Sequence, residues 1–132
     1  MAALSISNFA AVALGGAVGA SLRWLLGMTL NPLLTPLPLG TLGVNILGGY
    51  LVGVAVGVFH MHAEVTPAMK LFVVTGVLGG LTTFSSFTAE VVERLLAGHL
   101  VWAFLLISLH LGGALLATWL GLYSVGATRL WG

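Results

Sequence analysis

The sequence predicts an all-α membrane protein with four transmembrane helices. Of its 132 residues, 59% are hydrophobic and only 5% are charged, and the mean hydropathy is +1.15. Soluble domains carry about 25% charged residues, so a water-soluble fold is not expected. Four apolar segments are each long enough to cross a hydrocarbon core of about 30 Å, which takes about 20 helical residues. A helix is required because lipid offers the backbone no hydrogen-bond partners.

Charge and cysteine content exclude several classes of function. Four Lys and Arg residues stand against three Asp and Glu, so no basic surface is available for nucleic acid. Cysteine is absent, which removes disulfides, thiolate metal sites and cysteine nucleophiles. Glu64, Glu90 and Glu93 are expected near helix ends, where they would be solvated. None of them is placed for acid–base catalysis, so an enzyme is not expected.

The elements follow from the apolar segments and the turns between them. Helices are expected at about 5–30, 39–61, 68–96 and 99–125, in one transmembrane domain that spans residues 1–132. The first segment is apolar except for Arg23 near its end. Short polar or proline-containing turns at 31–38, 62–67 and 97–99 separate the segments.

Glycine is abundant and regularly spaced. Many of the 19 glycines recur at every fourth position, which places small residues on one helix face and lets two backbones approach closely. These rows are Gly15/Gly19, Gly49/Gly53/Gly57, Gly76/Gly80 and Gly113/Ala117/Gly121. Four helices packed this closely leave no lumen, so a pathway would require a second copy. The alternative is a compact bundle without a pathway.

The basic residues do not select an orientation in the membrane. With four spans, Lys70 and Arg129 lie on one side, and Arg23 and Arg94 lie on the other. Because an excess of Lys and Arg normally marks the cytoplasmic side, this balance predicts insertion in both orientations. Two opposed copies could then form a two-fold homodimer with its axis in the membrane plane. The alternative is a single orientation set by the α-amino group or the insertion machinery.

The third helix is expected to break near 79–83. Two adjacent glycines precede Thr-Thr and Ser-Ser there; glycine costs about 1 kcal/mol in a helix against alanine, and hydroxyls compete for backbone groups. A break would free carbonyls such as those of Gly79 and Thr82. At a two-fold axis such oxygens suit a small hard cation such as Na⁺. A structural cation fits better than a transported one, because no carboxylate is expected nearby.

The candidate path is expected to hold neutral hydrogen-bonding groups and no acidic residue, which favours a small anion as the permeating species. Phe84 and Phe87 share a helix face, and their positively polarised ring edges can contact an anion. Cation channels use rings of acidic side chains or of carbonyl oxygens. Proton-coupled drug transporters need a carboxylate embedded in the membrane. The hydrogen-bonding groups of the candidate path are Thr41, Asn45, Thr83, Ser85, Ser86 and Ser108.

Several residues also have ordinary structural interpretations. An asparagine within a span often joins two helices, and two phenylalanines at helical spacing often simply pack. His110 is two residues from Ser108 and hence on another face, so a hydrogen-bonded structural histidine is expected rather than a Ser–His relay. His60 and His62 could hold a metal but lack a third ligand.

Three motifs resemble those of the Fluc, or CrcB, family of fluoride ion channels. They are GGAVGA at 15–20 followed by Arg23, GTLGVNILG at 40–48, and GGLTTFSSF at 79–87. The resemblance spans nearly the whole chain, and the last two motifs together are highly specific. Members of this family are dual-topology homodimers with two antiparallel pores and a central, non-transported Na⁺ at the break in the third helix.

The resemblance implies roles for particular residues. Phe84 and Phe87 match the paired pore phenylalanines and Asn45 the pore asparagine, while Arg23 matches the first-helix arginine. The backbone carbonyls of Gly79 and Thr82 match the sodium ligands. Ser108 resembles the serine of the fourth-helix polar track. One turn before that serine, where many members have tyrosine, this chain has Phe104.

The expected function is therefore passive fluoride export through a dimer in the bacterial inner membrane, which lowers cytoplasmic fluoride and its toxicity. One alternative is a small dual-topology proton-coupled multidrug transporter, which would carry an embedded glutamate in its first helix. That helix carries only Arg23 as a charged residue. A second alternative is a packing subunit of a larger complex.

Overall fold

The computed structural model describes residues 3–131, and every regular element in that range is helical. Four segments are long and apolar enough to cross a membrane, namely Ile6–Leu33, Leu39–Met61, Pro67–Leu96 and Leu100–Ser124. The prediction of four membrane-spanning helical segments is confirmed. The elements are α1 (Ile6–Leu30), η1 (Asn31–Leu33), α2 (Leu39–Met61), α3 (Pro67–Lys70), η2 (Leu71–Leu78), α4 (Gly79–Leu81), α5 (Phe84–Leu96), α6 (Leu100–Ser124) and η3 (Ala127–Trp131).

Side-chain caps and prolines define where several helices begin. The Ser5 hydroxyl accepts a hydrogen bond from the Asn8 backbone at 3.2 Å and caps α1. The Thr66 hydroxyl caps α3 in the same way, with Pro67 in the first turn, where its missing N–H leaves no bond unmade. Pro38 precedes α2 in an extended conformation. The turns therefore lie where the polar and proline-containing stretches predict them.

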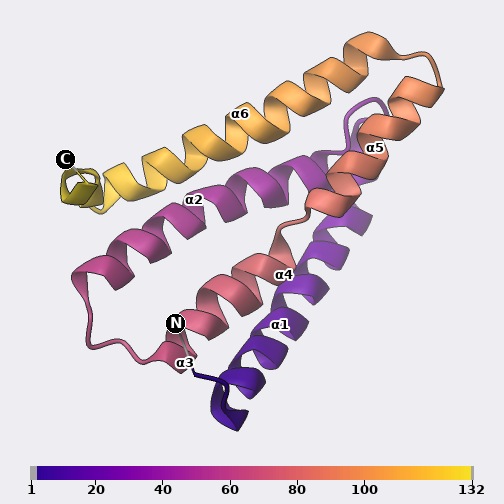
Figure 1. The fold of residues 1–132 in the computed structure, drawn as a ribbon. Helices are drawn as coiled ribbons and strands as arrows, with labels where there is room; N and C mark the ends of the chain where they lie inside the picture. Colours follow the sequence, from indigo (N-terminus) through magenta and orange to yellow (C-terminus); the bar gives the residue numbers. More distant parts are fainter. Residues whose placement is uncertain (1–2, 132) are drawn as a thin grey trace.

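The third segment is irregular along much of its length. Between α3 and α4 the η2 stretch is π-helical, a rare conformation that often occurs near functional sites. After α4 the backbone is extended at Thr82 (φ −81°, ψ 154°) and Thr83 (φ −148°, ψ 114°), and α5 begins at Phe84. This extended pair, called the interruption below, separates α4 from α5 in Figure 1.

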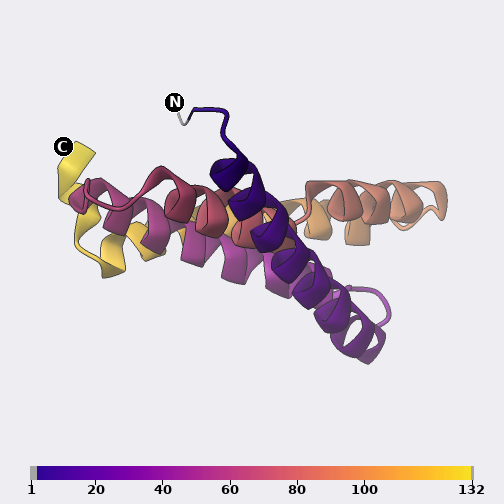
Figure 2. The same ribbon diagram turned by 90° about the horizontal axis from the view of Figure 1, so that it is seen from below.

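Glycine rows join the helices in two close pairs. Figures 1 and 2 show α2 and α6 side by side, while α1 crosses the third segment obliquely. A Cβ at Gly15 would lie 2.9 Å from the Cα of Gly76, and one at Gly53 would lie 2.9 Å from the Leu122 backbone nitrogen. The predicted small-residue faces therefore do pair within one chain: α1 with η2 and α4, and α2 with α6.

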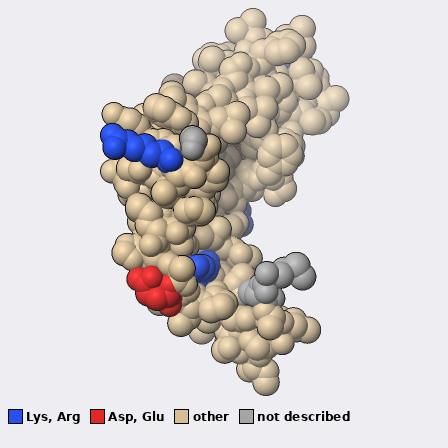
Figure 3. All heavy atoms as spheres, turned by 60° about the vertical axis from the view of Figure 1, so that its left-hand side comes forward, with Lys and Arg blue, Asp and Glu red and all other residues tan. Residues whose placement is uncertain are grey.

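Two small apolar clusters lie between these pairs. The first joins α2 to the third segment through Val44, Ala55, Leu78 and Leu81. The second joins α5 to α6 and contains Phe87, Val91, Ala103 and Leu106. Most other large apolar side chains are exposed, and the face drawn in Figure 3 carries few charged groups. Such an outer surface suits lipid as the surrounding solvent.

Replacing Gly121 by alanine tests the close approach of α6 to α2. The new Cβ would overlap the Tyr50 carbonyl oxygen and lie 2.9 Å from the Val54 nitrogen. We expect Gly121→Ala to lower the free energy of unfolding by about 1–3 kcal/mol, because the two backbones must separate. The measurement is equilibrium unfolding in mixed micelles. The matched control is Gly112→Ala in the same helix, where nothing lies within 4 Å, and equal stability losses in both variants would contradict the prediction.

Candidate functional site

Asn45 of α2 binds both backbone polar groups of Thr83. The Thr83 N–H donates to Asn45 Oδ1 at 2.8 Å, and Asn45 Nδ2 donates to the Thr83 carbonyl at 3.0 Å. In a continuous α-helix the Thr83 N–H would bond to the carbonyl of Gly79 instead. Asn45 therefore stabilises the interruption by replacing the hydrogen bond that the Thr83 N–H no longer makes within the helix, and by adding a bond to the Thr83 carbonyl.

Arg23 of α1 closes the end of α4. Its Nε donates to the Gly80 carbonyl at 3.0 Å, an oxygen that a continuous helix would bond to the N–H of Phe84. Arg23 was predicted near the end of the first span; the structure gives it this partner inside the protein. Its side chain is half-buried, so the guanidinium acts here as a helix cap between two spans.

Thr83 also caps the helix that follows it. Its hydroxyl oxygen accepts from the Ser86 backbone N–H at 3.1 Å, and its hydroxyl donates to Ser86 Oγ at 3.1 Å. Ser85 Oγ lies 3.3 Å from the same hydroxyl. Because the Ser86 N–H bonds to a side chain, it is withdrawn from the carbonyl of Thr82, its partner in a continuous helix. The carbonyls of Gly79 and Thr82 thus both lose their helical donors.

Asn45 fixes the tautomer of His110 on α6. Asn45 Nδ2 lies 2.9 Å from His110 Nδ1, and the amide orientation is set by Thr83, whose N–H needs Oδ1 and whose carbonyl needs Nδ2. Nδ2 carries two hydrogens, so His110 Nδ1 must accept one of them. His110 is consequently the neutral Nε2–H tautomer, and its Nε2 is buried without a hydrogen-bond partner among residues 3–131.

The two phenylalanines differ in their surroundings. Phe84 and Phe87 meet edge to face, with ring centroids 5.5 Å apart and an interplanar angle of 66°. Phe87 also stacks on His110 at 4.5 Å. Phe87 is only 5% exposed, whereas Phe84 is 69% exposed and lies at the surface of the single chain.

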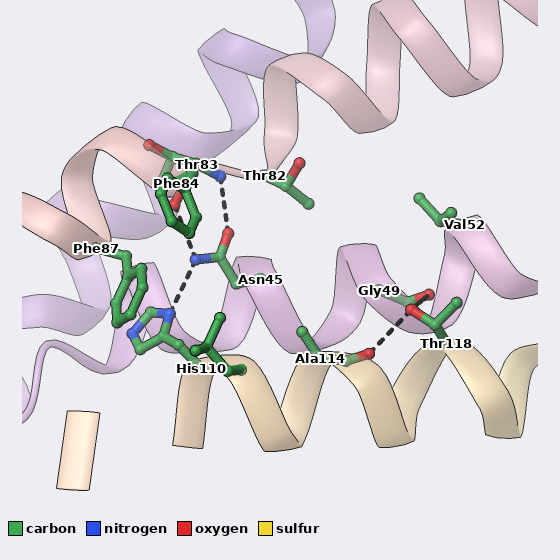
Figure 4. Close-up of a pocket in the computed structure, with 11 residues that line it drawn as sticks. Asn45, Gly49, Val52, Thr82, Thr83, Phe84, Phe87, His110, Ala114 and Thr118 are labelled. Carbon is green, nitrogen blue, oxygen red and sulfur yellow. Dashed lines mark hydrogen bonds between the residues drawn. The ribbon is translucent and has the colours of Figure 1, made fainter. Parts of the chain in front are cut away.

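A cavity of about 280 Å³ lies beside the interruption, between α2, α5 and α6. Figure 4 shows Asn45, Phe84 and Phe87 grouped with His110 at one end, and Thr118 further along α6. The walls are mainly apolar, with a few polar groups. The cavity is lined by Asn45, Gly49, Val52, Thr82, Thr83, Phe84, Phe87, His110, Leu111, Ala114 and Thr118.

A second, more polar cavity of about 370 Å³ lies on the α1 side of Thr83. Thr41 is central to it: its hydroxyl donates to Glu90 Oε1 at 2.7 Å, and its N–H donates to Asn31 Oδ1 at 3.1 Å. The cavity is lined by Arg23, Trp24, Gly27, Met28, Asn31, Thr41, Thr83, Ser86 and Glu90.

The expected position of Glu90 is wrong. Rather than being solvated at a helix end, Glu90 is half-buried, and its second carboxylate oxygen is buried without a partner among the residues described. The reason is that α5 continues to Leu96 and carries Glu90 alongside α2, within reach of Thr41. The candidate path therefore has an acidic residue beside it.

Of the predicted path residues, Ser85 and Ser108 line neither cavity. Ser108 is exposed, and its hydroxyl donates to the Phe104 carbonyl at 2.9 Å. Helical spacing explains its separation from His110: at 100° per residue, Ser108 lies opposite Ala117 on α6, whereas His110 lies within about 20° of it. The row Gly113/Ala117/Gly121 marks the face of α6 that packs inside the protein. In the sequence, that row indicates that His110, and not Ser108, lies on the inner face of α6.

No metal site forms around the His60-x-His62 pair. Within residues 3–131, no three His, Asp or Glu side chains gather as metal ligands. The His60 ring lies 5.0 Å from that of Trp131, and His62 Nδ1 lies 3.0 Å from Glu64 Oε1. A backbone hydrogen bond, followed by the one from His62, lowers the pKa of Glu64 below its usual value.

Known proteins match this chain over almost its whole length. A family model described as "CrcB-like protein, Camphor Resistance (CrcB)" matches residues 10–122. A relative from Dechloromonas aromatica, named "Fluoride-specific ion channel FluC", is 63% identical over 97% of this chain and 95% of its own length. Relatives of the same name come from Nitrosospira multiformis (53% identical; 87% and 90% covered) and Cupriavidus metallidurans (50%; 91% and 95%). The chain therefore belongs to the CrcB family.

Proposed function

We propose that this chain forms a fluoride-selective channel that lets fluoride leave the bacterial cell passively through the inner membrane and so limits its toxicity. The observation that carries the proposal is the high identity, over nearly the full length, to relatives named fluoride-specific ion channels. The activity is ion permeation, not catalysis. The two cavities that meet at Thr83 support it, because amide, hydroxyl and imidazole groups line them.

The path is proposed to run through these cavities past Thr83. Asn45, Phe84 and Phe87 lie on one side of Thr83, and Thr41 and Ser86 lie on the other. Ser85 joins the path through its contact with the Thr83 hydroxyl; Ser108 joins it only if a second copy covers its face of α6. A small anion that sheds water needs hydrogen-bond donors in place of its hydration shell.

The functional unit is proposed to be an antiparallel homodimer. Phe84 is 69% exposed and borders the first cavity, so this side of the cavity lies at the surface of the single chain. A second copy packed over this face would bury the Phe84 ring and enclose the cavity within protein. The even balance of basic residues supports insertion in both orientations.

A structural Na⁺ at the dimer centre is also proposed. The Gly79 and Thr82 carbonyls fit this ion because their helical donors, the N–H groups of Thr83 and Ser86, bond elsewhere. Carbonyl oxygens are suitable ligands for a hard cation. The ion would neutralise carbonyl dipoles that face each other across the two-fold axis, and it would remain in place during transport.

Efflux from liposomes tests the proposed function. Purified protein should release fluoride rapidly under a gradient with a potassium ionophore, while chloride stays inside, because larger anions do not fit between closely packed helices. Ion-selective electrodes measure both ions. An arm in which a large organic cation replaces sodium should show much slower fluoride release if Na⁺ is structural. Folded protein without fluoride release would refute the channel, whereas unchanged release without sodium would refute only the sodium site.

Single cysteines test dual topology cleanly, because the chain has none of its own. Ala63→Cys and Ala97→Cys lie in exposed turns on opposite sides of the proposed bundle. In intact cells each should react to about one half with a membrane-impermeant maleimide, since both orientations are expected from the balanced charge. Complete labelling of one variant and none of the other would establish a single orientation.

Substitution of the two phenylalanines should separate transport from folding. We expect Phe84→Ile to lower fluoride efflux by at least about tenfold with little change in stability, because the exposed ring packs against little else in the chain. Phe87→Ile should also lower the free energy of unfolding by about 1–3 kcal/mol, because its ring is buried against His110. The control is Phe9→Ile, a change to a ring that is 71% exposed on α1. Unchanged flux in Phe84→Ile would remove the aromatic edges from the mechanism.

A further inference from the structure

Among the residues that line the first cavity, His110 carries the one polar side-chain hydrogen that the described residues leave without an acceptor. Both hydrogens of Asn45 Nδ2 are donated, to the Thr83 carbonyl and to His110 Nδ1. The hydroxyls of Thr82 and Thr83 donate to the Leu78 carbonyl and to Ser86 Oγ. Thr118, at the far end, lies within hydrogen-bond distance of the Gly49 and Ala114 carbonyls.

His110 differs from these groups because its tautomer is imposed. Thr83 orients the Asn45 amide, and the amide in turn requires His110 Nδ1 to be an acceptor. The proton must then lie on Nε2, which is buried without a partner among residues 3–131. An unpaired buried donor destabilises a folded protein, so native structures contain few of them.

The surroundings of His110 suit an anion that has lost its water. His110 is 3% exposed and stacks on Phe87, which itself belongs to an apolar cluster with Val91, Ala103 and Leu106. In so dry a place a single N–H donor interacts strongly with a negative charge. Figure 4 shows the imidazole between Phe87 and Asn45, with its ring along the cavity wall.

We propose that the Nε2–H of His110 donates a hydrogen bond to dehydrated fluoride as the ion passes Phe87, and that Asn45 holds His110 in the tautomer that can do so. This inference rests on the proposed fluoride channel function. It assigns His110 to direct contact with the ion and Asn45 to positioning His110. The hydrogen-bonded structural role predicted for His110 is confirmed by its bond to Asn45, and the proposal adds a contact with the ion to that role.

Two substitutions separate the two nitrogens of His110. In His110→Asn the amide oxygen occupies roughly the place of Nδ1, so the bond to Asn45 is kept while the Nε2 donor is lost. In His110→Gln the longer side chain places an N–H₂ near the former Nε2, so a donor is kept. We expect His110→Gln to retain fluoride efflux within about tenfold of the wild type. His110→Asn should lose about 10- to 100-fold, as expected for one hydrogen bond to a charged group.

The matched control changes another histidine by the same two substitutions. His99→Asn and His99→Gln alter an exposed residue before α6, outside both cavities, and should leave efflux unchanged. Each variant is first checked for its oligomeric state and unfolding transition. The wild type is measured in liposomes of the same composition. If the wild type releases no fluoride, the proposed channel function itself is refuted. If the wild type releases fluoride, the efflux rates of the variants test the role of His110.

A spectroscopic measurement reports on His110 without mutation. Solid-state NMR of the protein with isotope-labelled histidine should show the neutral Nε2–H form of His110, with a signal that shifts as fluoride, but not chloride, is added. A fluoride-independent signal would mean that water fills the site and would overturn the proposal. The proposal would also be overturned if His110→Asn conducts fluoride and His110→Gln does not, or if both variants conduct fluoride as fast as the wild type. If both variants fold but conduct fluoride poorly, the NMR signal of His110 in the wild type decides: a shift with fluoride supports the proposed contact, and no shift overturns it.

Discussion

The backbone of Thr82 and Thr83 lies inside a membrane-spanning segment, where lipid offers its polar groups no hydrogen-bond partners, and the rest of the site depends on this constraint. Each unpaired peptide group in hydrocarbon costs several kcal/mol, so an interruption in a membrane helix persists only where it is buried in protein or lines a cavity. Asn45 binds the N–H and the carbonyl of Thr83, and Arg23 binds the carbonyl of Gly80, from two different helices. The interruption is therefore a feature of the tertiary structure, although its glycines and hydroxyl residues weaken the helix locally.

Close helix packing is what lets Asn45 reach Thr83. One turn after Asn45 on α2, Gly48 faces Thr82, and a Cβ there would overlap the Thr82 methyl group. Gly40, at the start of α2, likewise lies against the backbone of α1, where a Cβ would come within 2.7 Å of the Leu26 carbonyl. The glycines thus set the distance between the helices, and that distance puts the Asn45 amide within hydrogen-bond range. The same glycines therefore determine both the packing of the helices and the geometry of the site.

Sequence patterns predict the parts of this structure that depend on local composition. Hydropathy gives the four spans, four-residue spacing gives the glycine faces, and the motifs at 40–48 and 79–87 identify Asn45 and the phenylalanines. The contacts of Glu90, Arg23 and His110 depend instead on which helices become neighbours. Glu90 meets Thr41 across 49 positions of sequence, and Asn45 meets His110 across 65. Neither pairing has a local signal, and the π-helical turns of η2 have none either.

The first cavity has no fixed positive charge, which bears on how an anion could be chosen there. Arg23 lines the second cavity, on the far side of Thr83, together with Glu90. The Nε of Arg23 donates to the Gly80 carbonyl there. A full positive charge would attract every anion and release it slowly, whereas conduction needs binding weak enough for the ion to leave. Neutral donors instead favour an ion that gains much from each hydrogen bond and is small enough to approach it. Asn45, Thr82, Thr83 and Thr118 all donate their side-chain hydrogens to other groups of the protein. The geometry that creates the cavity therefore also keeps its free donors few.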